Sequence, residues 1–526
     1  MLGRADPQGS LLETRVLRRH LVTKDSFYER LADHGDDIVS DEDFARLYAP
    51  RLGRPSIPPS VMVRAMLCAT HDRTSDAETA RRSRVDADWK AAMGVDDDFP
   101  GIGATTFSLM RARMVAHDAD GELFNQTLAK AIEAKILAGP LTAIIDSSPV
   151  VGAGAVADTY ELIRGFLVKI RRAGGCRNKT TANRVAPLAG GKANIDWDDP
   201  QARKAHLGEL VALAKTVLAE APAPTDPGLA EALSHLAQII DADTDHDEEG
   251  EPKLRQGVAK DRIVSHSDPE MRHGRKSSSR RFNGHKLDLV TDEASELVLG
   301  MEVRAGNAAD GEGALPLLNK VRSALDELQA PAHTNEAVVA TVLGDMAYSD
   351  GDVRAAAEAA GMELVAKVPP VTNAGRFPKT DFYLDMARSE VTCPAGEVTT
   401  DARPTTDHKG RPALLYVFGP EGCASCPLRP ECTAGSGGRS ILIGVHEERM
   451  AAARAAQEEP ATKALLRRRA KIERKIDHLQ DLGMRKARYR GRRKTKLQGL
   501  LAATVANFAR LAVLGAFHTT GVAHAA

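Results

Sequence analysis

The sequence predicts an α/β fold with a mixed sheet, preceded by an all-helical N-terminal region. Between residues 141 and 368, short apolar runs typical of buried strands alternate with helical patterns, whereas residues 25–137 show helical patterns alone. Strands that alternate with helices form sheets whose faces the helices cover. The chain has 526 residues, 43% of them hydrophobic, which is enough for two to four structural units.

Three helix starts can be read in the N-terminal region. One follows Ser56 and a proline pair, and one follows Ser75, which has capping-box spacing to Glu78. A third begins at Thr105 and Thr106. Short helices of this kind occur in helix-turn-helix units that bind DNA. A helical packing domain without DNA contact is the alternative.

Acidic residues end two of the strand-like runs. Asp146 ends LTAIID and Asp345 ends AVVATVLGD. Two further strands, FNGHKLDLVTD and ELVLGMEVRAG, lie between them, followed by a helix with Asn307 and Asp310 as expected caps. A helix and a last strand, ELVAKVP, follow Asp345. Carboxylates at the ends of core strands do not serve packing, so both are candidate site residues.

The remaining stretches are expected as insertions and terminal regions. Two amphipathic helices interrupt the order of strands, and a strand-like segment with four cysteines follows the last strand. The expected parts are a flexible tail at 1–20, a helical DNA-binding domain at 21–137, the first part of the α/β core at 138–369 with a helical insertion at about 170–262, a β-rich insertion at 370–440, and basic helices at 441–526.

A third acid, Glu473, lies in a strongly basic region. Residues 467–496 contain 14 Lys and Arg against three acids, a local net charge of +11, although the whole chain has a net charge of −1. Such a region is typical of phosphate binding. A single helix is expected between Pro460 and Gly483, with Arg469 and Glu473 on one face. A surface ion pair is the simpler explanation for that pair, and Asp477 is the competing third acid.

Asp146, Asp345 and Glu473 together would form a catalytic set. Three carboxylates can hold two divalent cations about 3.5–4 Å apart, which activates a water or a 3′-hydroxyl in phosphodiester chemistry. Hard oxygen ligands suit Mg²⁺ or Mn²⁺ rather than zinc.

Further basic residues are candidates for DNA contact. One run precedes the second strand and would line the DNA path, with a solvated linker as the alternative. Tyr489 could stack on a base. The run consists of Arg272, Arg275, Lys276, Arg280 and Arg281.

Four of the six cysteines cluster in one segment. A CxxC pair with two further thiols could form a tetrahedral zinc site, and packing cysteines, reduced or disulfide-paired, are the alternative. These cysteines are Cys393, Cys423, Cys426 and Cys432. The N-terminus has no apolar signal region, and no run of about 18 apolar residues occurs, so a cytoplasmic protein is expected.

Taken together, these residues resemble a bacterial insertion-sequence transposase of the DDE class. The segments that carry the resemblance are FARLYAPRLGRPSIPPSVMVRAMLCAT, DPEMRHGRKSSSRRFNGHK, EVRAGNAADGE, GDMAYSD and KARYRGRRKTKLQ. The resemblance implies a ribonuclease-H-like catalytic domain in which Asp146, Asp345 and Glu473 are the catalytic and metal-binding residues. A related branch carries a Tyr, Arg, Glu, Lys signature. Arg469 and Glu473 fit it, whereas Leu466 and Gln480 stand at its Tyr and Lys positions.

The resemblance also implies an activity and partners. Such an enzyme cuts double-stranded DNA at terminal inverted repeats and joins 3′ ends to target DNA, with two or more protomers at the paired ends, in the nucleoid of the cytoplasm and without a membrane partner. A nuclease of the same fold without strand transfer, and an inactive DNA-binding relative, are the alternatives. In the related branch, the Tyr and Lys positions contact the transferred DNA end, and Leu466 and Gln480 do not match them. The residues expected to replace these contacts are Arg474, Arg485, Lys486 and Arg488.

Overall fold

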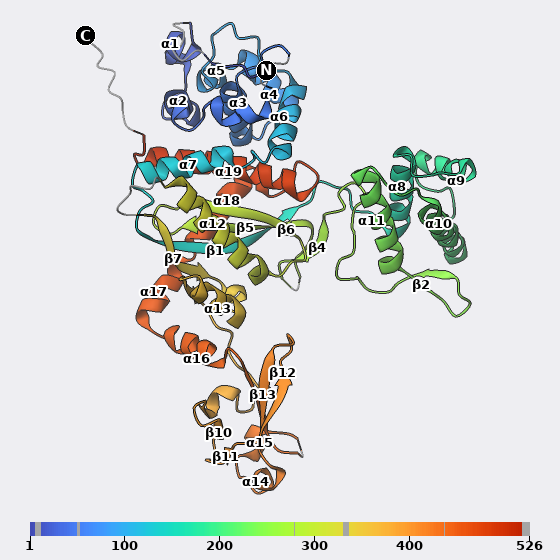
Figure 1. Ribbon diagram of the computed structural model, residues 1–526, viewed down its shortest axis with the longest axis vertical. Helices are drawn as coiled ribbons and strands as arrows, with labels where there is room; N and C mark the ends of the chain where they lie inside the picture. The colour runs from blue at the N-terminus through green and yellow to red at the C-terminus, as the bar shows by residue number, and fades with distance from the viewer. Residues whose placement is uncertain (6–11, 50–52, 278, 330–335, 436, 518–526) are drawn as a thin grey trace. The chain divides into compact units, whose positions relative to one another are not determined.

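The computed structural model describes residues 1–5, 12–49, 53–277, 279–329, 336–435 and 437–517 (Figure 1). It divides into two compact units. The first comprises residues 1–141, 146–338 and 471–526, and the second comprises 142–145 and 339–470. Part of the expected tail at 1–20 lies outside the described residues, and α1 (Thr14–Leu17) and η1 (Arg19–Leu21) lie near its end.

The N-terminal region is helical, as predicted. The Ser75 hydroxyl accepts a hydrogen bond from the Glu78 backbone N–H at 3.2 Å and caps its helix. Pro59 stands at the start of the preceding helix, where its missing N–H costs nothing. The elements are α2 (Phe27–His34), η2 (Gly35–Asp37), η3 (Glu42–Leu47), α3 (Pro59–Asp72), α4 (Asp76–Val85), α5 (Ala87–Met93), α6 (Ala104–Ala116) and α7 (Glu122–Glu133).

The main sheet is mixed, which confirms the predicted fold class. Its strand order is β4-β5-β1-β7-β8, and β6 pairs with β5. The β4–β5 and β5–β6 pairs are antiparallel and the β7–β8 pair is parallel. The strands are β1 (Pro140–Val151), β4 (Arg272–Arg275), β5 (Arg281–Asp292), β6 (Val298–Ala305), β7 (Val338–Gly344) and β8 (Glu363–Ala366). Between β6 and β7 lie η5 (Asp310–Gly313) and α12 (Ala314–Leu328).

Strand β1 is longer than its apolar run. Asp146 therefore lies in the middle of this strand, and the expectation that it ends a strand is wrong. The strand continues because its last residues find backbone partners: the Val151 N–H donates to the Arg485 carbonyl at 3.1 Å, and the Ala487 N–H donates to the Val151 carbonyl at 2.8 Å. Asp345 directly follows β7, as predicted.

The expectation of a single helix between Pro460 and Gly483 is also wrong. The structure has α17 (Pro460–Arg468), α18 (Lys471–Leu479) and a π-helical turn, η8 (Gln480–Met484). Three consecutive arginines, 467–469, concentrate like charge where α17 ends. Arg469 and Glu473 therefore do not share one uninterrupted helix.

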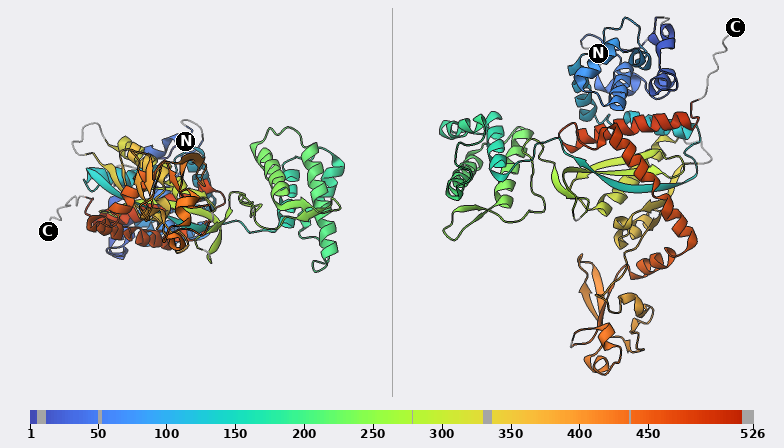
Figure 2. Two further views of the ribbon diagram at one scale, coloured as in Figure 1. Left: turned by 90° about the horizontal axis from the view of Figure 1, so that it is seen from below. Right: turned by 180° about the vertical axis from the view of Figure 1, so that it is seen from behind.

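The helical insertion, drawn in green in Figure 2, has a hydrophobic core of its own. Its fully buried residues include Leu162, Phe166 and Leu236. The helices of the insertion thus bury their apolar faces against one another. The elements are α8 (Thr159–Arg172), α9 (Lys179–Val185), η4 (Ala186–Gly190), α10 (Pro200–Glu220), α11 (Pro227–Asp243), β2 (Thr244–His246) and β3 (Pro252–Leu254).

The second unit combines part of the main sheet with a small β-rich segment. Beside β7 and β8 it contains η6 (Met346–Tyr348), α13 (Gly351–Ala359), α16 (Glu447–Ala456) and α17. The β-rich segment packs around a small core of Phe382, Val391, Tyr416, Phe418, Ile441 and Ile443. Its elements are η7 (Lys379–Asp381), β9 (Tyr383–Asp385), β10 (Glu390–Thr392), β11 (Val398–Thr399), β12 (Ala402–Thr406), β13 (Pro412–Val417), α14 (Pro420–Ala424), α15 (Arg429–Cys432) and β14 (Ser440–Gly444).

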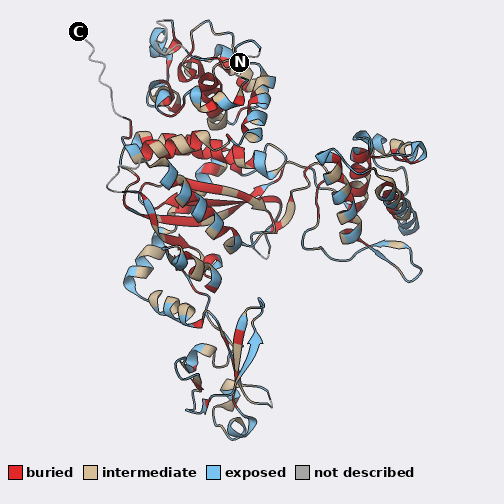
Figure 3. Cartoon of the chain, viewed as in Figure 1, coloured by how far each residue is buried: buried red, intermediate tan, exposed pale blue. Residues whose placement is uncertain are grey.

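Helix α19 (Arg492–Val513) is buried along most of its length (Figure 3). It packs against β6, α7 and α3. The fully buried Asn507 side chain accepts from the Val298 N–H at 2.8 Å and donates to the Val298 carbonyl at 2.9 Å, so it satisfies both backbone groups at the start of β6. Among the described residues, no helix has the length and apolarity that a membrane crossing requires.

We predict that Asn507→Leu destabilises the protein by about 2–5 kcal/mol, because it leaves two buried backbone groups of Val298 unsatisfied. Chemical denaturation would measure the change. Thr504→Val, which removes only a bond to the Leu500 carbonyl within the helix, is the control and should cost less than about 1.5 kcal/mol. Equal effects of both substitutions would contradict the role of Asn507.

Candidate active site

Asp146 lies half-buried on β1, and its Oδ1 accepts a hydrogen bond from the Ser147 N–H at 2.7 Å. Side chains alternate along a strand, so Asp146 and Ser148 lie on one face and Ser147 on the other. The Ser147 hydroxyl donates to Asp310 Oδ1 at 2.7 Å, which places Asp310 on the face opposite Asp146.

The helix that carries Glu473 lies on the same side of β1 as Asp146. Gln480, directly after α18, donates from Nε2 to Ser148 Oγ at 3.0 Å. Glu473 precedes Gln480 by two helical turns, about 10 Å, and Asp146 precedes Ser148 by two strand residues, about 7 Å. Glu473 is exposed, and so is Asp477 one turn later, so the structure keeps both as candidates.

Two ion pairs anchor the start of α18 to the turn between β5 and β6. Lys471 Nζ lies 2.6 Å from Glu293 Oε1, and an Arg474 nitrogen lies 3.0 Å from Glu296 Oε1. The helix is thus held at its first turn by the sheet and at its end by Ser148. Arg474, a predicted DNA contact, is engaged in one of these pairs.

Lys475 lies on the buried face of α18, where burial disfavours the charged form of its side chain. Burial is the main cause that lowers the pKa of this lysine to about 8, with Glu296 opposing the shift and Arg510 adding to it. The unfolded chain keeps the lysine proton up to about pH 10.4. Between pH 8 and 10 the unfolded state therefore binds more protons, and stability rises with pH.

We predict that Lys475→Met stabilises the protein at pH 7, on the order of 1–3 kcal/mol, because it removes the cost of burying a charge. This gain should shrink at pH 10, where the folded wild type is already neutral at this position. Denaturant unfolding at both pH values measures it, and Lys494→Met, at an exposed site, is the control. A gain of the same size at both pH values would be evidence against the buried-charge explanation.

In the second unit, Asp345 caps the short helix η6. Its Oδ1 accepts from the Ala347 N–H at 2.8 Å, and the residue is half-buried. A cavity of about 650 Å³ opens beside the next residue, Met346. Four cations line this cavity, against one acid, Glu458. They are Lys367, Lys463, Arg467 and Arg469.

The predicted basic run forms a β-hairpin rather than a linker. Strands β4 and β5 pair from Arg272 opposite Gly284 to Arg275 opposite Arg281, and the Lys276 N–H donates to the Arg280 carbonyl at 2.9 Å. Arg272 is half-buried, and burial is the main cause that lowers its pKa. The other four cations of the run are exposed at the hairpin end.

The candidates after α18 have structural partners. Arg485 forms an exposed ion pair with Asp481 at 3.3 Å, and an Arg488 nitrogen donates to the Thr74 carbonyl at 2.6 Å. The Arg111 guanidinium lies over the Tyr489 ring, 4.8 Å from its centroid, so an arginine covers one face of this ring. Lys486 pairs with Val151 through its backbone and has an exposed side chain.

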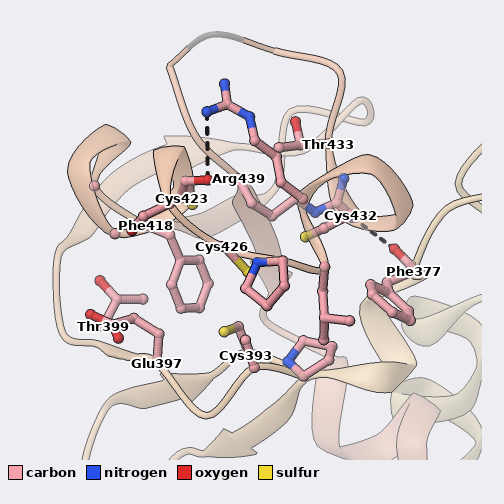
Figure 4. Close-up of a pocket in the computed structure, with 18 of the residues that line it drawn as sticks. Phe377, Cys393, Glu397, Thr399, Phe418, Cys423, Cys426, Cys432, Thr433 and Arg439 are labelled. Carbon is pink, nitrogen blue, oxygen red and sulfur yellow. Dashed lines mark hydrogen bonds between the residues drawn. The ribbon is translucent and has the colours of Figure 1, made fainter.

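The four clustered cysteines line one cavity of about 490 Å³ (Figure 4). All four are free thiols. Burial raises the pKa of Cys432, and the other three thiols add to the effect. Within the described ranges, no group of three or more His, Cys, Asp or Glu side chains is placed to hold a metal ion. Zinc binding therefore stays a prediction of the cysteine spacing.

That prediction can be checked by metal analysis of the protein purified under reducing conditions. Zinc at a four-thiol site should amount to about one ion per chain and be lost in Cys423→Ser/Cys426→Ser. Cys176→Ser, outside the cluster, should retain it. Zinc-free wild-type protein, or undiminished zinc in the double variant, would leave packing as the role of these thiols.

Two segments of the chain match models of known families. Residues 392–512 match a transposase DDE domain, and residues 16–113 match a second transposase domain. The chain is similar to insertion-sequence transposases of the DDE class. The first match includes Glu473 and the cysteine cluster, whereas Asp146 and Asp345 lie outside both matches. No curated protein matched the chain.

The similarity confirms the resemblance inferred from sequence. Sequence reasoning missed the long-range roles of four residues: Gln480 as the link to β1, Asp310 as the partner of Ser147, and Lys367 and Lys463 as cations that line the cavity. Lys367 and Lys463 carry no local signal because they line the cavity next to Met346 from separate segments.

Proposed function

We propose that the chain is a DNA transposase that cleaves the ends of its own element and joins the 3′-hydroxyls to target DNA. The observation that carries the proposal is the placement of α18, with Glu473, on the Asp146 side of β1. In strand order, β7, which precedes Asp345, is the neighbour of β1. The similarity to transposase domains supports DNA as the substrate.

Asp146, Asp345 and Glu473 would hold two Mg²⁺ or Mn²⁺ ions. The fit rests on donor chemistry and access alone, because all three are carboxylates and none is fully buried, while the described residues contain no preformed group of three such side chains around a metal position. When bound, such ions activate water or a 3′-hydroxyl and stabilise the leaving oxygen.

The residues of the chain supply phosphate binding and positioning. The cationic cavity next to Met346 suits the phosphates next to the scissile bond, since four cations line it against a single acid, Glu458, which lies 2.9 Å from Lys463. The exposed end of the β4–β5 hairpin adds four cations that suit the DNA backbone. The N-terminal helices and the basic region after α18 would bind the element ends, with two or more protomers pairing those ends.

We predict that Asp146→Asn, Asp345→Asn and Glu473→Gln each reduce Mg²⁺-dependent cleavage of element-end DNA by at least about 1,000-fold, the scale expected when a catalytic group is removed. End binding should stay within a few-fold of wild type, because none of the three binds phosphate directly.

The matched control is Asp477→Asn, one turn from Glu473, which should cleave normally. Loss of cleavage in Asp477→Asn together with activity in Glu473→Gln would move the third ligand to Asp477. Precut ends that are not joined to target DNA would indicate a nuclease without strand transfer. End binding without Mg²⁺-dependent cleavage in both wild type and Asp146→Asn would indicate an inactive DNA-binding relative.

A further inference from the structure

The helical insertion contains one strongly basic stretch and one strongly acidic stretch. Residues 162–195 contain eight Lys and Arg and no acid, whereas residues 241–251 contain seven acids. Six of the basic residues lie in α8, α9 and their connection, and they define the basic end of the insertion. They are Lys169, Arg171, Arg172, Arg177, Lys179 and Arg184.

The basic end is exposed and unneutralised. All six residues are exposed, and within the described part of the chain none of them forms an ion pair. Glu220, the acid that reaches α9, accepts a hydrogen bond from the Thr181 hydroxyl at 2.7 Å instead. The acidic run, in contrast, is partly neutralised, since Lys204 lies 2.6 Å from Asp247.

The two charged ends are far apart on one rigid support. Lys204 near the start of α10 contacts the acidic run, and Glu220 at its end contacts α9. Sixteen residues of helix separate them, about 24 Å. This distance is about three Debye lengths at physiological salt, so the acidic run contributes little to the electrostatic potential at the basic end.

The basic end also has a fixed shape. Arg171 Nε donates to the Ala182 carbonyl at 3.1 Å and joins α8 to α9. Gly174, with φ +77°, ends α8, and the Gly175 N–H donates to the Ile170 carbonyl at 2.9 Å. Phe166 and Ile170, both fully buried, fix the inner side of α8.

Other cations of the first unit lie near the start of this surface. Burial lowers the pKa of His266; Glu161 opposes this effect, and the positive charges of Arg164, Arg490 and Lys169 add to it. Lys169 and Arg490 thus lie within electrostatic reach of one histidine.

We propose that the basic end of the insertion is a second DNA-binding surface that contacts the phosphate backbone of the element end outside the cleavage site. This proposal rests on the proposed function for the identity of the DNA. Six exposed cations, none of them in an ion pair among the described residues, suit a polyanion read by charge, and their distribution over two joined helices suits a duplex backbone rather than one bound ion.

The test compares full-length wild type with Arg172→Ala/Arg177→Ala, using a fluorescein-labelled mixed-sequence DNA duplex in metal-free buffer. Fluorescence anisotropy across a salt series gives the affinity and its salt dependence. Each lost phosphate contact lowers the slope of log K against log salt by about 0.9, so a decrease of roughly 1–2 is expected. The matched control is Arg203→Ala/Lys253→Ala, which removes two exposed cations elsewhere in the insertion and should leave the slope unchanged.

The outcomes separate this proposal from the proposed function. Wild-type binding and cleavage with an unchanged slope in Arg172→Ala/Arg177→Ala would overturn the second surface and leave the transposase assignment standing. A reduced slope in a chain that never cleaves element ends would keep the surface and reject the assignment. Loss of binding to phosphatidylserine vesicles in the variant, with unchanged DNA affinity, would also overturn the proposal. Circular dichroism confirms that each variant is folded.

Discussion

The burial of α19 is the constraint on which the rest of the first unit depends. This helix is apolar around most of its circumference, which is typical of a helix enclosed by other elements rather than one lying on a surface. It packs against β6 on one side and against α3, α6 and α7 on others, so the N-terminal helices and the sheet share one core. Its buried polar residues are all bonded: Thr504 to its own helix, Asn507 to Val298, Gln498 to the preceding segment, and Thr495 to the Gly491 carbonyl.

Gln498 connects that core to the candidate site. Its Oε1 accepts from the Arg488 N–H at 2.8 Å, and its Nε2 donates to the carbonyls of Gly483 and Lys486 at 3.0 and 3.1 Å. The segment held in this way pairs with the end of β1 through Val151. Glu473 therefore does not depend on local helix stability for its position. The helix that carries it, α18, is anchored at its first turn by the sheet, and the chain after this helix is fixed by a buried amide whose loss would leave three backbone groups unpaired.

Sequence reasoning predicted what is encoded locally. The N-terminal helices were found because caps such as Ser75 and periodic apolar residues act within a few positions, and the β5–β6 hairpin because both strands and their turn are contiguous. The length of β1 was not predictable, because it depends on partners more than 100 residues away in Asn283 and 485–487. Asp310 shows the same limit: expected as a helix cap, it instead binds Lys286 at 2.6 Å and Ser147, while Gly313 precedes α12. The carboxylates could be located in sequence, but the face toward which Asp146 points required the bond between Gln480 and Ser148.

The charge distribution has a further consequence for how the chain would engage DNA. With a net charge of −1, the protein has little long-range attraction for a polyanion, so encounter must depend on local patches. Screening limits each patch to about 8 Å at physiological salt. The exposed hairpin end of β4–β5, the basic end of the insertion and the region after α18 are such patches, and each belongs to the first unit. Affinity that is spread over several short-range patches falls steeply with salt, because each phosphate contact contributes separately to counterion release. The acidic run of the insertion works in the opposite direction, since a duplex that approached β2 and β3 would meet repulsion. The charge distribution within the insertion therefore favours DNA that approaches the basic end over DNA that approaches the acidic run, and this preference does not depend on the DNA sequence.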